Sequence, residues 1–433
     1  MRKILLLVAL LWIMVGCQLP TLSTDANLVV TETVAEGDTV GVAVTPEATA
    51  ISTPEPTPVN YTLTIWGPES FSEAQSPSFS AVLADFAAPL SDLSIQYEVK
   101  AMEGAASLVR YLDSGSAVAP SILPDLILFP ADQLLEVAGS GLLVPVDPYL
   151  DATFLEDLYP LRQQARFGGS LLAVPALLSV SHGIIRAESG VTVPPDLEAM
   201  TAETSPTWRL YQRPGESGPL NDMELVQLAS LNEKNGLLVA PNPSALTAML
   251  SEWQQMGAAN KLQTPATDHN ALYAALLGDS VDFIADDSRT YLQQVASGAA
   301  LSYAYIPVHE ANFTPLADGY LLAVSTDDPR RQATALALLE ALMEPSALSE
   351  WSAASQWLPA RRSALQRSAF DAGYREFADE LLQRAQLRPS APDWVSFAQF
   401  FQSQLQQLAR TSDASPSEIA RQLLERYPSG SLP

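Results

Sequence analysis

The chain has 433 residues, of which 47% are hydrophobic and 17% are charged, so it is long and apolar enough to form two folded domains. Its 49 acidic residues outnumber its 23 basic residues, and the resulting net charge of −26 disfavours binding to nucleic acid or to an anionic membrane surface. A single cysteine excludes an intrachain disulfide, and that cysteine with only three histidines argues against a zinc site.

The N-terminus has the pattern of an export signal, predicted over residues 1–16. Arg2 and Lys3 precede an apolar run over 4–15, which is shorter than the ~20 residues of a membrane-spanning helix. The run ends at Met14-Val15-Gly16-Cys17, which resembles the bacterial lipobox, although that motif usually has leucine where Met14 stands. The resemblance implies cleavage before Cys17 and attachment of diacylglycerol to its sulfur. An ordinary signal peptide with a chance cysteine is the alternative.

Residues 17–60 are expected to form a lipidated cysteine and a disordered tether. Positions 18–60 contain six acidic residues and no lysine or arginine, and the proline-rich part over 45–58 cannot continue a helix or bury a core. Proline-rich chains extend by about 3.1 Å per residue. Cleavage after residue 16 removes two basic residues and no acid, so the mature charge becomes −28.

A folded body begins at Tyr61 with an alternation of strands and helices. Apolar residues alternate at period two or run continuously in the predicted strands, which lie at 61–66, 95–99 and 125–129. One-sided apolar stripes predict helices at 79–90 and 105–112, and a short helix follows at 132–138. This order predicts an α/β body whose right-handed crossovers build a parallel sheet.

The second half is richer in helix. Leu246, Met249, Leu250 and Trp253 form a stripe that predicts a core-facing helix. Further strands are predicted at 281–285, 301–306 and 319–324. Asp328 before Pro329 predicts a capped helix start, and Ser415-Pro416-Ser417-Glu418 predicts a capping box at the start of the last helix.

No catalytic motif is present. The sequence lacks the Gly-x-Ser-x-Gly elbow, the His-Glu-x-x-His zinc motif and the phosphate-binding Gly-rich loop. His182, His269 and His309 show no metal-ligand spacing and are interpreted as surface or packing residues. We therefore predict no enzyme activity, catalytic residue, cofactor or metal. Carboxylates are numerous, so an extracellular glycosidase stays open as an alternative, with Asp286 and Asp287 as its best pair.

Several segments stand in a characteristic order along the body. They are Leu63–Gly67, Pro124–Phe129, Gly141–Asp147, Gly169–Pro175, Ala335–Met343 and Trp351–Ala364. Their order and spacing over about 61–427 resemble the extracellular solute-binding proteins of ABC importers, specifically the sugar-binding, maltose-binding-type group. Departures occur at Ser181–Arg186, where the family usually has an aromatic-Asn stretch, and at Arg209-Leu210-Tyr211, where it is usually acidic. Both fall near expected ligand-facing loops, where they would affect which substrate is bound.

The resemblance implies a two-lobed α/β fold of the periplasmic-binding-protein type II. Each lobe would be a mainly parallel sheet flanked by helices, and a hinge would close the cleft between the lobes on a ligand. Matching the segments assigns 61–175 and 299–345 to the N-terminal lobe, and 176–298 and 346–433 to the C-terminal lobe.

Aromatic rings and carboxylates near strand ends are the candidate ligand contacts, because rings cover the C–H face of a sugar and carboxylates accept from its hydroxyls. The candidates near strand ends are Trp66, Glu69, Phe129, Asp132, Asp286 and Asp287, and the resemblance adds Tyr320 and Trp357 at the family's late ligand-facing positions. Core packing is the alternative for Trp66 and Phe129, and helix capping is the alternative for Asp132.

The expected function is a lipid-anchored substrate-binding subunit on the outer face of the cell membrane. It would capture a carbohydrate or other neutral polyol as a monomer and deliver it to the transmembrane subunits of an ABC permease, without nucleic acid and with lipid as its only membrane contact. A surface sensor or adhesin with the same binding fold is the non-transport alternative.

Overall fold

The computed structural model of the protein describes residues 61–428 except 120–121, 203–204, 212–221, 233–236, 238, 267, 312, 390 and 412. The chain divides into two compact units, and every described residue belongs to the second, which begins at Pro58. The predicted export signal, Cys17 and the tether lie outside the described residues.

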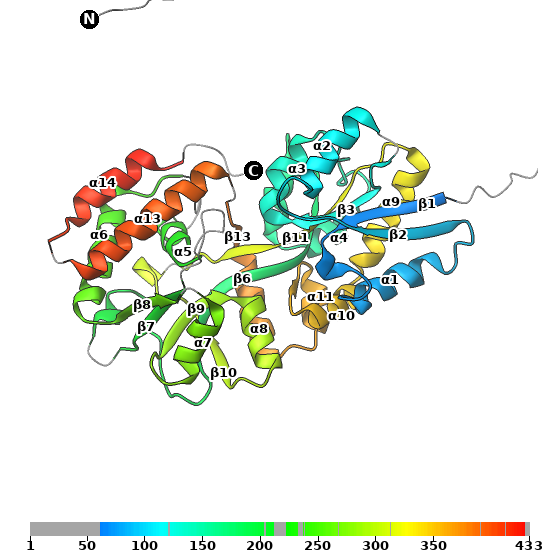
Figure 1. Cartoon of the computed structure of the whole chain (residues 1–433). Coiled ribbons are helices and arrows are strands. Elements are labelled where there is room, and N and C mark those ends of the chain that lie inside the picture. Colours follow the sequence, from blue (N-terminus) through cyan, green and yellow to red (C-terminus); the bar gives the residue numbers. More distant parts are fainter. Residues whose placement is uncertain are drawn as a thin grey trace, which may run out of the picture. The chain divides into compact units, whose positions relative to one another are not determined.

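One large mixed sheet organises the body, and its main path runs β2-β1-β3-β11-β6-β9-β7-β8 (Figure 1). Its strands are β1 (Tyr61–Gly67), β2 (Leu93–Val99), β3 (Leu126–Pro130), β6 (Val174–Arg186), β7 (Trp208–Tyr211), β8 (Leu262–Ala266), β9 (Phe283–Asp287), β10 (Leu301–Ala304), β11 (Leu316–Val324), β12 (Leu358–Pro359) and β13 (Gln386–Leu387). A separate small hairpin joins β4 (Arg166–Phe167) to β5 (Ser170–Leu171).

The two ends of the sheet are parallel, and the middle is antiparallel. β1 pairs in parallel with β2 and β3, and β7 pairs in parallel with β8 and β9. β6 connects these ends, because it pairs antiparallel with β11 through 174–180 and with β9 through 181–185. We call the β2-β1-β3 end the first lobe and the β9-β7-β8 end the second lobe. The predicted two-lobed α/β fold is confirmed.

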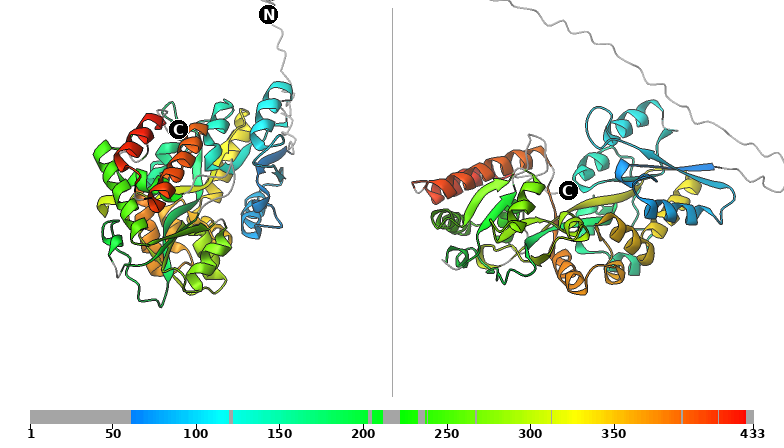
Figure 2. Two further views of the ribbon diagram at one scale, coloured as in Figure 1. Left: turned by 60° about the vertical axis from the view of Figure 1, so that its left-hand side comes forward. Right: turned by 60° about the horizontal axis from the view of Figure 1, so that its bottom comes forward.

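Helices flank both lobes. They are α1 (Pro77–Ala87), α2 (Leu108–Val118), α3 (Leu134–Gly139), α4 (Ala152–Asp157), α5 (Asp222–Ser230), α6 (Pro243–Ala258), α7 (His269–Leu277), α8 (Ser288–Ala296), α9 (Pro329–Leu342), α10 (Pro345–Ser355), α11 (Arg362–Arg367), α12 (Ala372–Arg384), α13 (Pro392–Arg410) and α14 (Pro416–Arg426). The orange and red helices α13 and α14 lie beside the green α6 in Figure 1 and in both views of Figure 2. Among the described residues, no helix combines the length and the apolar character that crossing a bilayer requires.

The contacts of helix α10 indicate which lobe it belongs to. It contacts α1 and α9, and its Trp351 ring lies 5.4 Å from the Phe71 ring and 4.9 Å from the Phe79 ring. These contacts place α10 with the first lobe, whereas the sequence-based division assigned all of 346–433 to the second. We therefore propose the division with α10 moved to the first lobe.

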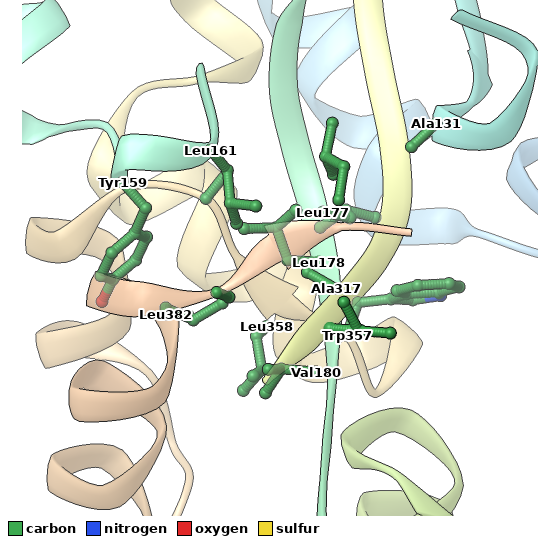
Figure 3. Close-up of a cluster of buried hydrophobic side chains, with 14 of the residues drawn as sticks. Ala131, Tyr159, Leu161, Leu177, Leu178, Val180, Ala317, Trp357, Leu358 and Leu382 are labelled. Atoms are coloured by element: carbon green, nitrogen blue, oxygen red, sulfur yellow. The ribbon is translucent and has the colours of Figure 1, made fainter. Parts of the chain in front are cut away.

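The crossing region of β6 and β11 is packed as a continuous core. Figure 3 shows Leu177, Leu178 and Val180 of β6 with Ala317 of β11 and Leu358 of β12, and each of these side chains is buried. The ring of Trp357 extends to the side away from Tyr159 and Leu382 in this view (Figure 3). Trp357, which precedes β12, is therefore held against this packed core, beside the strands that link the lobes.

Two helix starts agree with the caps that the sequence predicts. Asp328 accepts hydrogen bonds from the Arg330 and Arg331 backbone amides at the start of α9. Ser415 accepts from the Glu418 amide at 3.4 Å at the start of α14, but the Glu418 carboxylate binds Arg421 and Gln422. The second cap is thus confirmed for Ser415, while the reciprocal bond of a full capping box is replaced by an ion pair.

Candidate functional site

Tyr320 and Trp357, two of the candidate ligand contacts, lie together beside the crossing strands. Their ring centroids are 5.2 Å apart in an edge-to-face arrangement, and the Tyr320 ring also lies 4.8 Å from that of Phe71. The Tyr320 side chain is half-buried, and Trp357 is 7% exposed. Rings from β11, from the loop before β12 and from the 3-10 turn η1 (Glu69–Phe71) therefore form one aromatic group.

The backbone around Tyr320 explains its position. A β-bulge between Tyr320 and Leu321 shifts the register against β6, and bulges re-aim side chains next to binding sites. The preceding residue, Gly319, lies so close to β6 that an added Cβ would come within 3.0 Å of the Leu178 Cα. Glycine at this position therefore permits β11 to approach β6 closely. This close approach places Tyr320 next to Trp357.

Arg289 joins the aromatic group from the second lobe. It lies in the first turn of α8, and its guanidinium carbon is 4.7 Å from the centroid of the Trp357 ring, a cation–π distance. Burial raises the pKa of Tyr320, and a Ser70 hydrogen bond and the charge of Arg289 oppose that rise. Arg289 was missed in the sequence, where the only signal was its position directly after the strand-end residues Asp286-Asp287-Ser288.

Asp132 lies close to this group, since its charge acts on Tyr320. Desolvation by the surrounding protein, followed by the charge of Asp318, raises the pKa of Asp132 to about 6, while Arg388 opposes the shift. Arg388 Nη1 donates to Asp318 Oδ2 at 3.0 Å. Asp132 is nevertheless exposed, so its carboxyl group is accessible to a ligand.

The capping alternative for Asp132 is not realised. The N-cap of α3 is Gln133, which makes no side-chain capping bond, and Asp132 itself belongs to the preceding 3-10 turn η3 (Ala131–Gln133). Tyr320 pairs with Pro130 across β11 and β3, so Asp132 is two residues from the partner of Tyr320. Glu69, also a candidate, is exposed in η1 two residues before Phe71.

Trp66 and Phe129 are placed in the core instead. Phe129 has no exposed area and pairs through its backbone with Leu321 in the middle of the sheet. Trp66 is 2% exposed, with Tyr111 against its edge and Lys100 Nζ 4.3 Å from its ring centroid. The core alternative applies to both residues, because neither has more than 2% of its area accessible to a ligand.

Asp286 and Asp287 are engaged in contacts that support α7 and α8. Asp286 Oδ2 lies 2.7 Å from His269 Nδ1, and burial raises the pKa of this carboxyl to about 6. Asp287 caps α8 by accepting from the Thr290 amide at 2.9 Å, and the Ser179 hydroxyl donates to it at 3.0 Å. Both carboxylates are already engaged in these contacts, which weakens the case for the pair as the acid and base of a glycosidase.

These features define a class of protein: two α/β lobes joined by shared strands, with aromatic and charged side chains where the lobes meet. A sequence profile of the bacterial extracellular solute-binding protein family matches residues 84–376. The chain belongs to this family. Its members are extracellular, which places the chain outside the cytoplasm, and they are binding proteins rather than enzymes.

Solved structures share the fold at low sequence identity. The cyclic alpha-maltosyl-1,6-maltose binding protein from Arthrobacter globiformis aligns with a TM-score of 0.66 at 17% identity, covering 84% of this chain and 98% of its own. The sugar-binding protein MalE from Xanthomonas citri aligns with a TM-score of 0.65 at 16% identity, covering 85% and 96%. The GacH receptor of Streptomyces glaucescens, solved unliganded and with acarbose, aligns with a TM-score of 0.60 at 20% identity, covering 84% and 97%. A search of the curated proteins found no match.

Proposed function

We propose that the protein is the lipid-anchored substrate-binding subunit of an ABC transporter, and that it captures a carbohydrate where its two lobes meet. The observation that carries the proposal is the group formed by Tyr320, Trp357 and Arg289 next to the exposed Asp132. Family membership and the carbohydrate ligands named for proteins of the same fold support it.

The chemistry of the group suits an oligosaccharide. Two aromatic rings offer rigid apolar area to the C–H face of a pyranose. Arg289 donates hydrogen bonds, while Asp132 and Glu69 supply acceptors for hydroxyl groups. The mature body without its tether has a net charge of −22, which disfavours an anionic solute and fits a neutral one.

The two lobes contribute different parts of this group. Asp132 follows β3 of the first lobe, and Tyr320 lies on β11, which pairs with β3. Arg289 lies in the first turn of α8, whose N-cap residue Asp287 ends β9 of the second lobe. A ligand that touches both sets favours the arrangement in which they are close, so capture couples to hinge closure. Closure in turn is the signal that a permease would recognise.

Binding is tested by calorimetric titration of the mature body with maltotriose, acarbose and a panel of other sugars, polyols, peptides and amino acids. We expect saturable binding of an oligosaccharide. Trp357→Ala should weaken it at least about tenfold, because removing a buried ring costs about 1.5–3 kcal/mol of apolar contact. Tyr149→Ala is the control, since Tyr149 is 54% exposed and belongs to no part of the proposed site. A lack of response to every solute class, or equal weakening by both variants, would contradict the proposal.

Transport is tested separately from binding. Vesicles that contain a candidate ABC permease should take up the identified sugar only when the protein is added. Binding without any stimulation of uptake would instead support the sensor or adhesin alternative.

A further inference from the structure

His269, Asp286 and Asp287 bring three potential metal ligands to one corner of the second lobe. One donor atom from each residue lies within 4.8 Å of the other two, and no other group of this kind occurs among the described residues. Their positions are set by different elements, because His269 begins α7 and both aspartates end β9. The sequence does not reveal this group, because 17 positions separate His269 from Asp286.

The three residues differ in how far they are exposed to solvent. Asp286 is 5% exposed, Asp287 is half-buried, and about a third of the His269 side chain is exposed. Asp286 Oδ1 accepts from the Asp287 amide at 2.9 Å and Oδ2 faces His269 Nδ1, so the carboxylate is held in a fixed orientation. A pre-oriented, partly buried carboxylate beside an imidazole provides the kinds of ligand that zinc sites use.

Tyr273 supplies an independent observation at the same place. Its side chain is 2% exposed, and its hydroxyl has no well-formed hydrogen bond to any described group. Tyr273 lies one turn after His269 on α7, so the two side chains project from the same face of the helix. A buried hydroxyl without a well-made partner is costly, and it gains a partner when a cation or its bound water occupies the corner.

We propose that His269, Asp286 and Asp287 bind a divalent transition-metal ion of the zinc class. The ligand types select this class, because imidazole favours zinc and related ions whereas magnesium and calcium favour oxygen alone. The bound ion joins the first turn of α7 to the end of β9 and the start of α8. It offsets the charge of two adjacent carboxylates that the fold otherwise holds together. This site is independent of the proposed carbohydrate site and does not require sugar binding.

The test uses tag-free mature protein, stripped with a chelator and titrated with Zn²⁺ alone. We expect one saturable site per chain and a higher thermal midpoint in the presence of Zn²⁺, because an ion that binds only the native state stabilises it. Co²⁺ in place of Zn²⁺ should give visible absorption bands that report its coordination. An equal concentration of Mg²⁺ should leave the Zn²⁺ affinity unchanged.

Two variants and a matched control localise the ion. His269→Gln and Asp286→Asn should each lower the Zn²⁺ affinity at least about tenfold and remove the Co²⁺ bands. His309→Gln is the control, because His309 also contacts a carboxylate, that of Glu252 at 2.9 Å, outside the proposed site. Should Asp286→Asn fail to fold, His269→Gln alone decides, since that side chain is partly exposed.

No saturable Zn²⁺ binding, or an affinity that His269→Gln leaves unchanged, would overturn the proposal. Parallel titration with maltotriose separates this outcome from a failure of the proposed function, because the two sites share no residue that both proposals require.

Discussion

His182 lies on β6 with no exposed area, its Nδ1 2.8 Å from the Gly183 carbonyl oxygen and its Nε2 3.2 Å from the Tyr374 hydroxyl. The rings of Tyr291, Tyr374 and Phe377 pack edge-on around it. Burial lowers the pKa of His182 to about 4, so the ring is neutral in the folded protein near pH 7. The interpretation of His182 as a packing residue is thus confirmed, and its environment has a consequence for stability.

Acidification should destabilise the protein through His182. In the unfolded chain this ring takes up a proton near pH 6.5, whereas in the folded state it resists protonation down to about pH 4. The unfolded state therefore binds more protons in this window, and stability falls as the pH falls, by about 2 kcal/mol between pH 7 and pH 5. Urea unfolding at the two pH values measures this loss.

His182→Phe keeps a buried ring but removes the titrating group. It lowers stability at both pH values, because the Gly183 carbonyl and Tyr374 hydroxyl lose their partner. The difference between pH 7 and pH 5 should nevertheless shrink by about 2 kcal/mol. An equal pH dependence in the variant and the parent would show that His182 is not responsible.

Residue types and spacing predicted some site residues but not their partners. The family resemblance predicts Tyr320 and Trp357 as ligand contacts, and the structure brings them together. Their positions near strand ends predict Trp66 and Phe129 as ligand contacts, but the sequence does not reveal which side chains the helices cover. The sequence does not predict Arg289, because its contact with Trp357 joins positions 68 residues apart, which no local pattern records.

At the scale of elements, the second lobe depends on close packing between α6 and α13. Gly257 near the end of α6 faces the α13 backbone, and an added Cβ would lie 2.6 Å from the Ala409 Cα and closer still to its carbonyl oxygen. Backbone atoms cannot rotate away as a flexible side chain can. This glycine therefore sets how near the two helices approach.

Gly257→Ala should destabilise the protein although alanine is the better helix former. Alanine gains up to about 1 kcal/mol of helix propensity, but forcing the two backbones apart costs about 1–3 kcal/mol or more. Gly139→Ala near the end of α3 is the control, because its added Cβ meets nothing within 4 Å. Urea midpoints should fall for the first variant and stay level or rise for the second. Equal midpoints for the two variants would contradict the close packing.

Element types followed from local patterns, whereas element boundaries depended on distant partners. The predicted strand at 281–285 appears as β9 over Phe283–Asp287, because its register is set by pairing with Ser181 to Ile185 of β6. Asp286 and Asp287 are consequently strand residues with backbone partners rather than a free strand end. The helix predicted to reach 90 ends at Ala87 for a similar reason, since the Leu90 carbonyl bonds the amide at the start of β2.

At the scale of the whole molecule, the negative net charge opposes attachment to the membrane, whereas the proposed lipid anchor favours it. The mature chain has a proposed net charge of −28, which repels an anionic membrane face at short range. Lipid on Cys17 would overcome this repulsion, since each buried methylene contributes about 0.8 kcal/mol and two or more chains anchor stably.

Fold class was predictable from the order of strands and helices, but the pairing of β6 with both lobes was not, because it joins residues far apart in the chain.

Cys17→Ser in the full-length chain should therefore release the protein from membranes completely. The parent should incorporate a labelled fatty acid and partition into a detergent phase, whereas the variant should do neither. Because the variant keeps its negative charge, washing at low salt should recover it in the soluble fraction, with no electrostatic retention on anionic lipid. Gly16→Ala, a small-to-small change at the neighbouring position, is the control and should remain labelled. A parent that stays unlabelled, or a Cys17→Ser variant that remains membrane-bound, would contradict the lipid anchor and favour an ordinary signal peptide.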